Sequence, residues 1–247
     1  MNAAPEDQLR LLDVQELDST IDRLEHRRAT LPEHAEIEQL GERKAALSDD
    51  IVRAETADSD LGREQAKVDT DVEQVRARMQ RDQQRLDSGQ VGSPKELENL
   101  QSEIESLHRR QTELEDAELE VMEQREEVQN RLSALKEELA GVETSLAEVT
   151  ARRDLTLGEI AADAEKTAAQ RAETSATLPA DLLALYDKLR ASSGGIGAAA
   201  LHRGQCQGCH LQLNTTDLNR IRDAEPDEVL RCEECRRILV RTNESGI

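Results

Sequence analysis

The stretch DSGQVGSPKELENL, residues 87–100, decides how the chain folds. Five of its residues have turn or helix-capping chemistry: Gly89, Gly92, Ser93, Pro94 and Glu96. The two glycines can adopt the left-handed backbone conformations that end a helix and reverse the chain. The serine is placed to cap a new helix, the proline suits its first position, and the glutamate three residues after the serine completes a capping box. We therefore predict a chain reversal whose tip lies near residues 88–94.

Heptad patterns of apolar residues run on both sides of this stretch. Between Ile37 and Leu86, 11 of the 15 positions spaced alternately by three and four residues are apolar, and a second seam runs from Leu97 to Val149. This spacing is typical of a coiled coil. If the chain reverses, facing positions have residue numbers that sum to about 183, which places Asp58 opposite Arg125. We expect this polar pair to set the register of the two helices rather than to add stability.

Two further features concern this predicted hairpin. Pro32 follows a shorter apolar stripe that begins at Val14, and the heptad frame shifts before Ile37, so we expect a break or kink near Pro32. Heptads alone do not identify the helix that fills a seam, and a coiled coil between two chains is the alternative. The capped turn and the mirrored register favour a hairpin within one chain, and the oligomeric state is left open.

Composition and charge favour long exposed helices. The 247 residues include no Phe, no Trp and one Tyr, and 34% are charged, so a large globular core is not expected. Residues 1–175 hold 23 basic and 43 acidic residues, whereas residues 176–247 hold 9 and 10. The acidic helices should repel nucleic acid and present a solvated surface. With no signal-like start and no apolar span, we expect a cytoplasmic protein without a membrane partner.

All four cysteines fall in two identical pairs near the end of the sequence. The pairs are C-x2-C motifs with 22 residues between them: Cys206, Cys209, Cys232 and Cys235. Four thiolates at this spacing indicate one structural Zn²⁺ held in a tetrahedron. His210 gives the first pair the C-x-x-C-H pattern of covalent haem attachment, but such attachment normally follows export. An iron–sulfur cluster or a redox dithiol could also use these thiols, and His202 and His210 are expected to lie near the site without ligating the metal.

The sequence therefore predicts a mainly α protein: a long antiparallel coiled-coil hairpin followed by a small four-cysteine zinc ribbon of β-hairpins and a short helix. We assign residues 1–175 to the hairpin, 176–195 to a short amphipathic helix with a Gly-rich flexible linker, and 196–247 to the ribbon. Tyr186 is expected to be a packing residue of the short helix. In the ribbon, Asn214 with Asp217 can cap a helix inserted between the cysteine pairs. Without aromatic residues, this module needs its metal to fold.

The metal and the remaining motifs argue against catalysis. A catalytic zinc keeps one coordination position open, and four cysteines leave none. The sequence contains no Walker loop, no nucleotide-binding glycine fingerprint and no nucleophile paired with a base. We therefore expect a protein that is not an enzyme and has no small-molecule substrate.

Three functions are compatible with these features. The first is an adaptor or chaperone-like protein that binds partner proteins through the hairpin and the ribbon. The second is nucleic-acid binding through the arginines of the ribbon, although this segment also holds eight acidic residues and no aromatic residue for base stacking. The third is redox or zinc sensing by the thiolates. The arginines that could contact a partner or a phosphate backbone are Arg203, Arg220, Arg222, Arg231, Arg236, Arg237 and Arg241.

The order of these parts resembles the bacterial family of C4-type zinc-ribbon and coiled-coil hairpin proteins. The resemblance rests on LLDVQELDSTIDRLEHRRATLP (11–32), SPKELENLQSEIESL (93–107), LPADLLALYDKLR (178–190), CQGCHLQLNTTDLNRIR (206–222) and VLRCEECRRILV (229–240). It implies zinc ligation by the four cysteines. Arg236 departs from the pattern, because relatives often have Gly after the fourth cysteine. Adaptor, chaperone and nucleic-acid-binding roles have been proposed within this family, and the resemblance does not choose among them.

Overall fold

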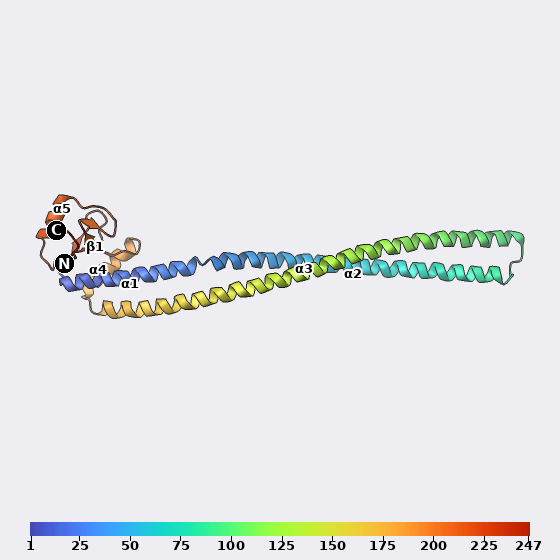
Figure 1. Cartoon of the computed structure of the whole chain (residues 1–247), viewed down its shortest axis with the longest axis horizontal. Helices are drawn as coiled ribbons and strands as arrows, with labels where there is room; N and C mark the ends of the chain where they lie inside the picture. Colours follow the sequence, from blue (N-terminus) through green and yellow to red (C-terminus); the bar gives the residue numbers. More distant parts are fainter. The chain divides into compact units, whose positions relative to one another are not determined.

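The computed structural model describes all 247 residues, of which 75% are helical (Figure 1). It divides into two compact units: residues 35–150 form the hairpin unit, and residues 1–34 with 151–247 form the base unit. No helix in it is both long and apolar enough to cross a membrane. The elements in chain order are α1 (Pro5–Ala29), α2 (Pro32–Asp87), α3 (Pro94–Ala176), α4 (Ala180–Ser192), β1 (Ala198–His202), β2 (Gln205–Cys206), α5 (Thr215–Asp223), β3 (Leu230–Arg231) and β4 (Ile238–Val240).

The hairpin unit consists of α2 and α3 packed antiparallel along one narrow apolar seam. Its buried residues are spaced along both helices: Leu47, Ile51, Ala54, Val72, Leu100, Leu114, Val121 and Val149. Ion pairs between the two helices flank this seam, including Lys44 with Glu143 at 2.9 Å and Lys136 with Glu55 at 2.8 Å. Such exposed pairs contribute at most about 1 kcal/mol each. The repeated apolar layers therefore provide most of the stability of the hairpin, as its heptads predicted.

A polar layer interrupts the apolar seam at Asp58 and Arg125, the pair predicted from the heptads. The Nε atom of Arg125 donates to Asp58 Oδ1 at 3.0 Å, and a guanidinium NH2 group of the same side chain donates to Gln65 Oε1 at 3.0 Å. Gln129 also donates to Asp58 Oδ1 at 2.9 Å, and these hydrogen bonds lower the pKa of the Asp58 carboxyl. A Cβ at Gly62 would lie 3.3 Å from this guanidinium, so the glycine leaves room for it. The layer is satisfied internally, and it contains the Asp58–Arg125 pair expected from the mirrored heptads.

The turn at the tip is built by the capping residues predicted from the sequence. Ser93 Oγ accepts a hydrogen bond from Glu96 N at 3.2 Å, and Glu96 Oε2 accepts from Gly92 N at 3.1 Å. Gly89 has a φ of 64°, the left-handed conformation expected of it. Gly92 does not adopt a positive φ; its backbone N–H instead takes part in the cap. One left-handed residue is therefore enough to end α2, and the capping box begins α3.

The helix break expected near Pro32 is confirmed. α1 ends at Ala29, and α2 begins at Pro32. The N–H of Thr30 donates to His26 O at 3.0 Å, which closes the last turn of α1. Proline has no N–H to continue a helix but suits the first position of a new one, which explains why the break lies here.

The base unit contains a four-stranded sheet with the order β2-β1-β4-β3. β1 pairs antiparallel with β2, and β3 pairs antiparallel with β4, as expected for a ribbon. The central pair, β1 with β4, is parallel, which the sequence pattern did not predict. The chain makes this parallel pair possible because α5 and the second cysteine pair lie between the two strands in sequence. Residues at the start of the chain also join the ribbon: Ala3 N donates to Asp227 O at 2.8 Å, and Val229 N donates to Met1 O at 3.1 Å.

The sheet separates two apolar clusters. Alternation along β4 assigns Ile238 and Val240 to a cluster with α1 and α4, and Leu239 to a cluster around α5 and the cysteines. The first cluster includes Leu11, Val14, Leu182 and Tyr186, and the second includes Leu201, Cys206, Ile221 and Cys232. Both ends of the predicted hairpin segment, residues 1–34 and 151–175, thus belong to the same compact unit as the ribbon.

Candidate metal centre

The four cysteine sulfurs converge within the base unit. All four lie within 4.8 Å of one another, and Sγ atoms are 3.9 Å apart both between Cys206 and Cys235 and between Cys209 and Cys232. A tetrahedron with Zn–S bonds of about 2.3 Å has edges of about 3.8 Å. The sulfur arrangement therefore fits one tetrahedral Zn²⁺, and the C4 zinc site predicted from the cysteine spacing holds a structural zinc.

Each C-x-x-C pair forms the same backbone turn, which we call a knuckle: the first is residues 206–209 and the second is 232–235. His210 N donates to Cys206 O at 2.8 Å, and Arg236 N donates to Cys232 O at 2.9 Å. The residue after each knuckle is left-handed, with φ of 60° at His210 and 65° at Arg236. Glycine adopts this conformation without steric cost, whereas other residues do so uncommonly. The departure noted at Arg236 therefore falls on a position where the backbone geometry itself favours Gly.

Burial makes two of the four thiols, Cys206 and Cys232, harder to ionise in the absence of a cation, whereas at Cys235 burial is outweighed by hydrogen bonds to the sulfur, which lower its pKa. Burial raises the pKa of Cys206 to about 12, although the N–H groups of Cys209 and Gly208 donate to its sulfur and oppose the increase. Burial likewise raises the pKa of Cys232. A bound Zn²⁺ stabilises thiolates and offsets this cost, and four sulfur ligands leave it no position for water or substrate. The donor set is therefore that of a closed structural site.

The two histidines near the first knuckle lie outside the sulfur cluster. His202 Nδ1 is 3.1 Å from Glu244 Oε2. His210 is exposed, and its backbone carbonyl accepts a hydrogen bond from Gln205 at 2.7 Å. The group of side chains whose ligand atoms converge consists of the four cysteines and includes neither histidine.

The seven arginines of the ribbon do not form one free basic face. Arg237 and Arg241 each donate three hydrogen bonds to backbone carbonyls, and Arg231 Nε donates to Arg236 O at 2.8 Å. Glu233 lies 2.6 Å from the guanidinium of Arg220 and 3.5 Å from that of Arg236. Of the other two, Arg222 donates to Asn219 on the same helix, and Arg203 is exposed.

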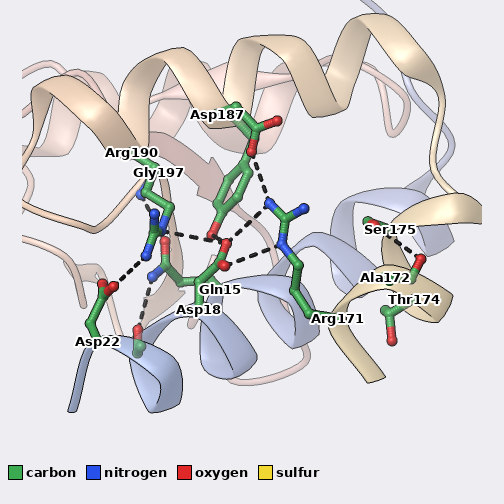
Figure 2. A network of polar contacts seen from close by, with 12 residues as sticks. Gln15, Asp18, Asp22, Arg171, Ala172, Thr174, Ser175, Asp187, Arg190 and Gly197 are labelled. Carbon is green, nitrogen blue, oxygen red and sulfur yellow. Dashed lines mark hydrogen bonds and ion pairs between the residues drawn. The ribbon is translucent and has the colours of Figure 1, made fainter. Parts of the chain in front are cut away.

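A second polar cluster, which the sequence pattern did not reveal, lies within the base unit (Figure 2). Asp18 on α1 is 4% exposed, and its carboxylate accepts from the Tyr186 hydroxyl at 2.7 Å and from Arg171 Nε at 3.2 Å. Arg190 Nε lies 3.5 Å from Asp18, and the same guanidinium also reaches Asp22 at 2.5 Å. Burial and the Asp18 contact raise the pKa of Tyr186. This cluster joins α1, the end of α3 and α4.

Gln15, one turn before Asp18, holds the glycine-rich segment between α4 and β1. Its Oε1 accepts from Gly197 N at 2.7 Å, and its Nε2 donates to Gly195 O at 3.0 Å. A sequence signal for both side chains existed: counted from Leu11, they occupy the i+4 and i+7 positions of a helical stripe. The apolar stripe through Val14 is the stronger signal in this helix, and it does not include these two buried polar positions.

The comparisons with known proteins agree with this architecture. A family model described as "CT398-like coiled coil hairpin domain" matches residues 14–194, and one described as "C4-type zinc ribbon domain" matches residues 205–239. The chain belongs to the CT398-like coiled-coil hairpin family. Both halves of the resemblance seen in the sequence, the hairpin and the four-cysteine ribbon, are thus matched by family models.

Relatives within the CT398-like family extend over the whole chain. An uncharacterized protein of Mycobacterium tuberculosis is 36% identical over 241 residues, 98% of each protein, and one of Mycobacterium leprae is 28% identical over 88% of this chain and 93% of its own. A solved structure from Mycobacterium smegmatis has a TM-score of 0.85 at 32% identity and covers 98% of this chain and 100% of its own. CT398 of Chlamydia trachomatis has a TM-score of 0.70 at 19% identity and covers 96% and 98%. At that identity the last likeness shows the fold alone.

Proposed function

We propose that this protein is a non-enzymatic adaptor that binds partner proteins along its helical hairpin, with the zinc ribbon as a structural element of the base. The observation that carries the proposal is the exposure of large apolar side chains on the hairpin unit. Leu119 is 57% exposed, Met122 is 43% exposed, and Val52 on α2 is 61% exposed. A hairpin with one narrow seam leaves the outer faces of its helices available to another protein.

The surroundings of Leu119 and Met122 support a protein partner of defined chemistry. The two side chains are three residues apart and therefore lie near each other on the outer surface of α3. Asp116, Glu120 and Glu123 are acidic residues close to them in the sequence of this helix. Apolar anchors within an acidic surface suit an amphipathic partner helix with basic residues around its apolar stripe.

The metal centre supports a structural role for the ribbon. Its four sulfurs complete a tetrahedron, and a closed zinc site holds a fold together rather than activating water. Most of the ribbon arginines donate to carbonyls or carboxylates of the same chain, which makes nucleic-acid binding the weaker of the two proposals. Partner binding by the hairpin accounts for the exposed apolar residues, and nucleic-acid binding by the ribbon does not.

Affinity capture from a bacterial extract tests the proposal. The baits are the intact protein, the double variant Leu119→Ser with Met122→Ser, and Leu155→Ser, which removes a 73% exposed leucine from α3 within the base unit as a matched control. Each bait is used with and without nuclease. We expect the intact protein and the control to retain the same nuclease-resistant proteins and the double variant to lose them. Recovery of nucleic acid alone, or of proteins that disappear after nuclease treatment, would favour the ribbon arginines instead.

A further inference from the structure

Arg237 connects the zinc knuckles to the segment between α4 and β1, residues 193–197, which we call the 193–197 loop. Its guanidinium donates from Nε to Ile196 O at 3.0 Å and from an NH2 group to Ser193 O at 2.7 Å. A third hydrogen bond, of 2.8 Å, goes to Gly208 O inside the first knuckle. One side chain therefore holds both the loop and the first knuckle.

The backbone of Arg237 is tied to the second knuckle. Its carbonyl accepts from Cys232 N at 3.0 Å, and its N–H donates to the sulfur of Cys235. The Arg237 side chain also packs closely against the first knuckle. A Cβ added at Gly208 would lie only 2.9 Å from it. The position of this guanidinium thus depends on both knuckles being ordered.

The 193–197 loop is held from its other side by α1. Gln15, which is 8% exposed, accepts a hydrogen bond from Gly197 N (Figure 2) and donates one to Gly195 O. Its Oε1 also accepts from Ala198 N at 3.3 Å. A Cβ at Gly197 would lie 2.7 Å from the carbonyl oxygen of Tyr186, so α4 also packs closely on the loop. A segment that composition predicted to be a flexible linker is therefore fixed on two sides by hydrogen bonds.

We propose that Arg237 and the 193–197 loop couple zinc binding at the four cysteines to the docking of α1 on the ribbon. The contacts form a continuous route. The Arg237 guanidinium connects the knuckles to the 193–197 loop, and Gln15 connects this loop to α1. When the zinc leaves, the buried sulfurs no longer hold the knuckles together, Arg237 loses Gly208 O, and the loop loses its support. Because coupling between two binding events is reciprocal, α1 docking in turn increases the affinity of the four cysteines for zinc.

Hydrogen exchange of the full-length protein tests the first half of this coupling. Amides are compared in the zinc-loaded protein and after removal of zinc by a chelator. We expect residues 5–29 and the 193–197 loop to lose protection together with the knuckles, while residues 35–150 keep theirs. Unchanged protection of α1 after chelation would overturn the proposal.

Zinc affinity of α1 variants tests the second half. Gln15→Ala leaves the ribbon sequence intact, so it keeps the test valid even if ribbon variants fold poorly. We expect it to raise the zinc dissociation constant, measured by competition with a chromophoric chelator, at least about fivefold, within the usual range of coupling. Glu16→Ala, an exposed neighbour, should leave the constant unchanged. Equal zinc affinity in the Gln15→Ala variant and the intact protein would contradict the coupling.

A double-variant cycle separates a shared route from two independent effects. Arg237→Gln removes the guanidinium, with Arg222→Gln as a ribbon control whose guanidinium donates to Asn219 on its own helix. If both residues act through the 193–197 loop, the combined change in zinc affinity for Gln15→Ala with Arg237→Gln should be smaller than the product of the two single changes. Changes that multiply fully would show that the loop does not transmit the coupling.

Discussion

The hairpin unit and the base unit are stabilised in opposite ways. In the hairpin unit, residues 35–150, similar apolar layers recur along two helices, and each layer contributes a small part of the stability. In the base unit, a few concentrated features hold elements that are distant in sequence: four cysteines, the buried carboxylate of Asp18 and the close contact at Gly197. The comparison shows that a repeated interface distributes the effect of a substitution, whereas a small core without Phe or Trp depends on single residues.

Loss of the metal should have the largest effect on stability, and it should unfold part of the base unit while leaving the hairpin unit folded. In the Cys232→Ser, Cys235→Ser variant the zinc content should fall to zero and the ribbon should unfold, because structural zinc contributes about 10–16 kcal/mol in small zinc-dependent folds. Helical circular dichroism from the hairpin unit should persist. Metal analysis together with limited proteolysis checks this, and a ribbon that resists protease without zinc would contradict it.

Removal of the Asp18 carboxylate should give the next largest effect. Asp18→Ala removes the buried acceptor of the Tyr186 hydroxyl and of Arg171, and the ion-pair partner of Arg190. It should destabilise the base unit by about 3 kcal/mol, the low end for a broken buried ion pair. Tyr186 is the only aromatic residue, so its fluorescence in a urea titration reports on this unit alone. Asp22→Ala, which removes a carboxylate 43% exposed, is the control and should cost less than about 1 kcal/mol. Equal losses in the two variants would show that Asp18 is not the centre of the cluster.

The substitution Gly197→Ala should lower the free energy of unfolding of the base unit by about 1–3 kcal/mol. The added Cβ would lie 2.7 Å from a backbone oxygen of α4 and 2.8 Å from the Tyr186 ring, so α4 or the 193–197 loop must shift. The midpoint of urea unfolding followed by Tyr186 fluorescence measures this cost. An unchanged midpoint would mean that the loop can move without penalty, which would also weaken its proposed role in zinc coupling.

A Gly→Ala substitution in the hairpin unit should instead raise the free energy of unfolding, and by a smaller amount. Gly141 lies inside α3 with no atom within 4 Å of an added Cβ. Gly141→Ala should therefore stabilise the helix by about 0.5–1 kcal/mol, through a smaller loss of backbone entropy on folding. Thermal unfolding followed by circular dichroism checks this, and a lower midpoint would show that α3 is constrained at this position in a way that the packing does not reveal.

The two units also differ in how much of them the sequence could predict. The heptads, the turn and the Asp58 layer follow from local pattern and symmetry, so the helices of the hairpin and their register were predictable from spacing alone. The cysteine pairs likewise identify their metal by count and spacing. Chemistry that repeats or that belongs to one motif can be recognised without a structure.

The contacts that the sequence did not predict are made between residues that are far apart in the chain. Gln15 and Asp18 look like ordinary polar residues of an exposed helix until α4 and the 193–197 loop are placed against them. Arg237 was grouped with six other arginines as a possible partner contact, yet its guanidinium donates to three backbone carbonyls of its own chain. The parallel pairing of β1 with β4 was missed for a related reason, since the alanines of β1 give no strong strand signal.

The hydrogen bond between Gln15 and Gly197 spans 182 residues of sequence, and this separation sets an order of events during synthesis. A ribosome that adds 5–20 residues per second needs roughly 10–40 s to produce the second partner after the first. The hairpin can close outward from its turn within that time, because its contacts begin between near neighbours. Helix α1, in contrast, must wait for the ribbon with its apolar stripe uncovered. The first helix to be made is therefore among the last to be packed.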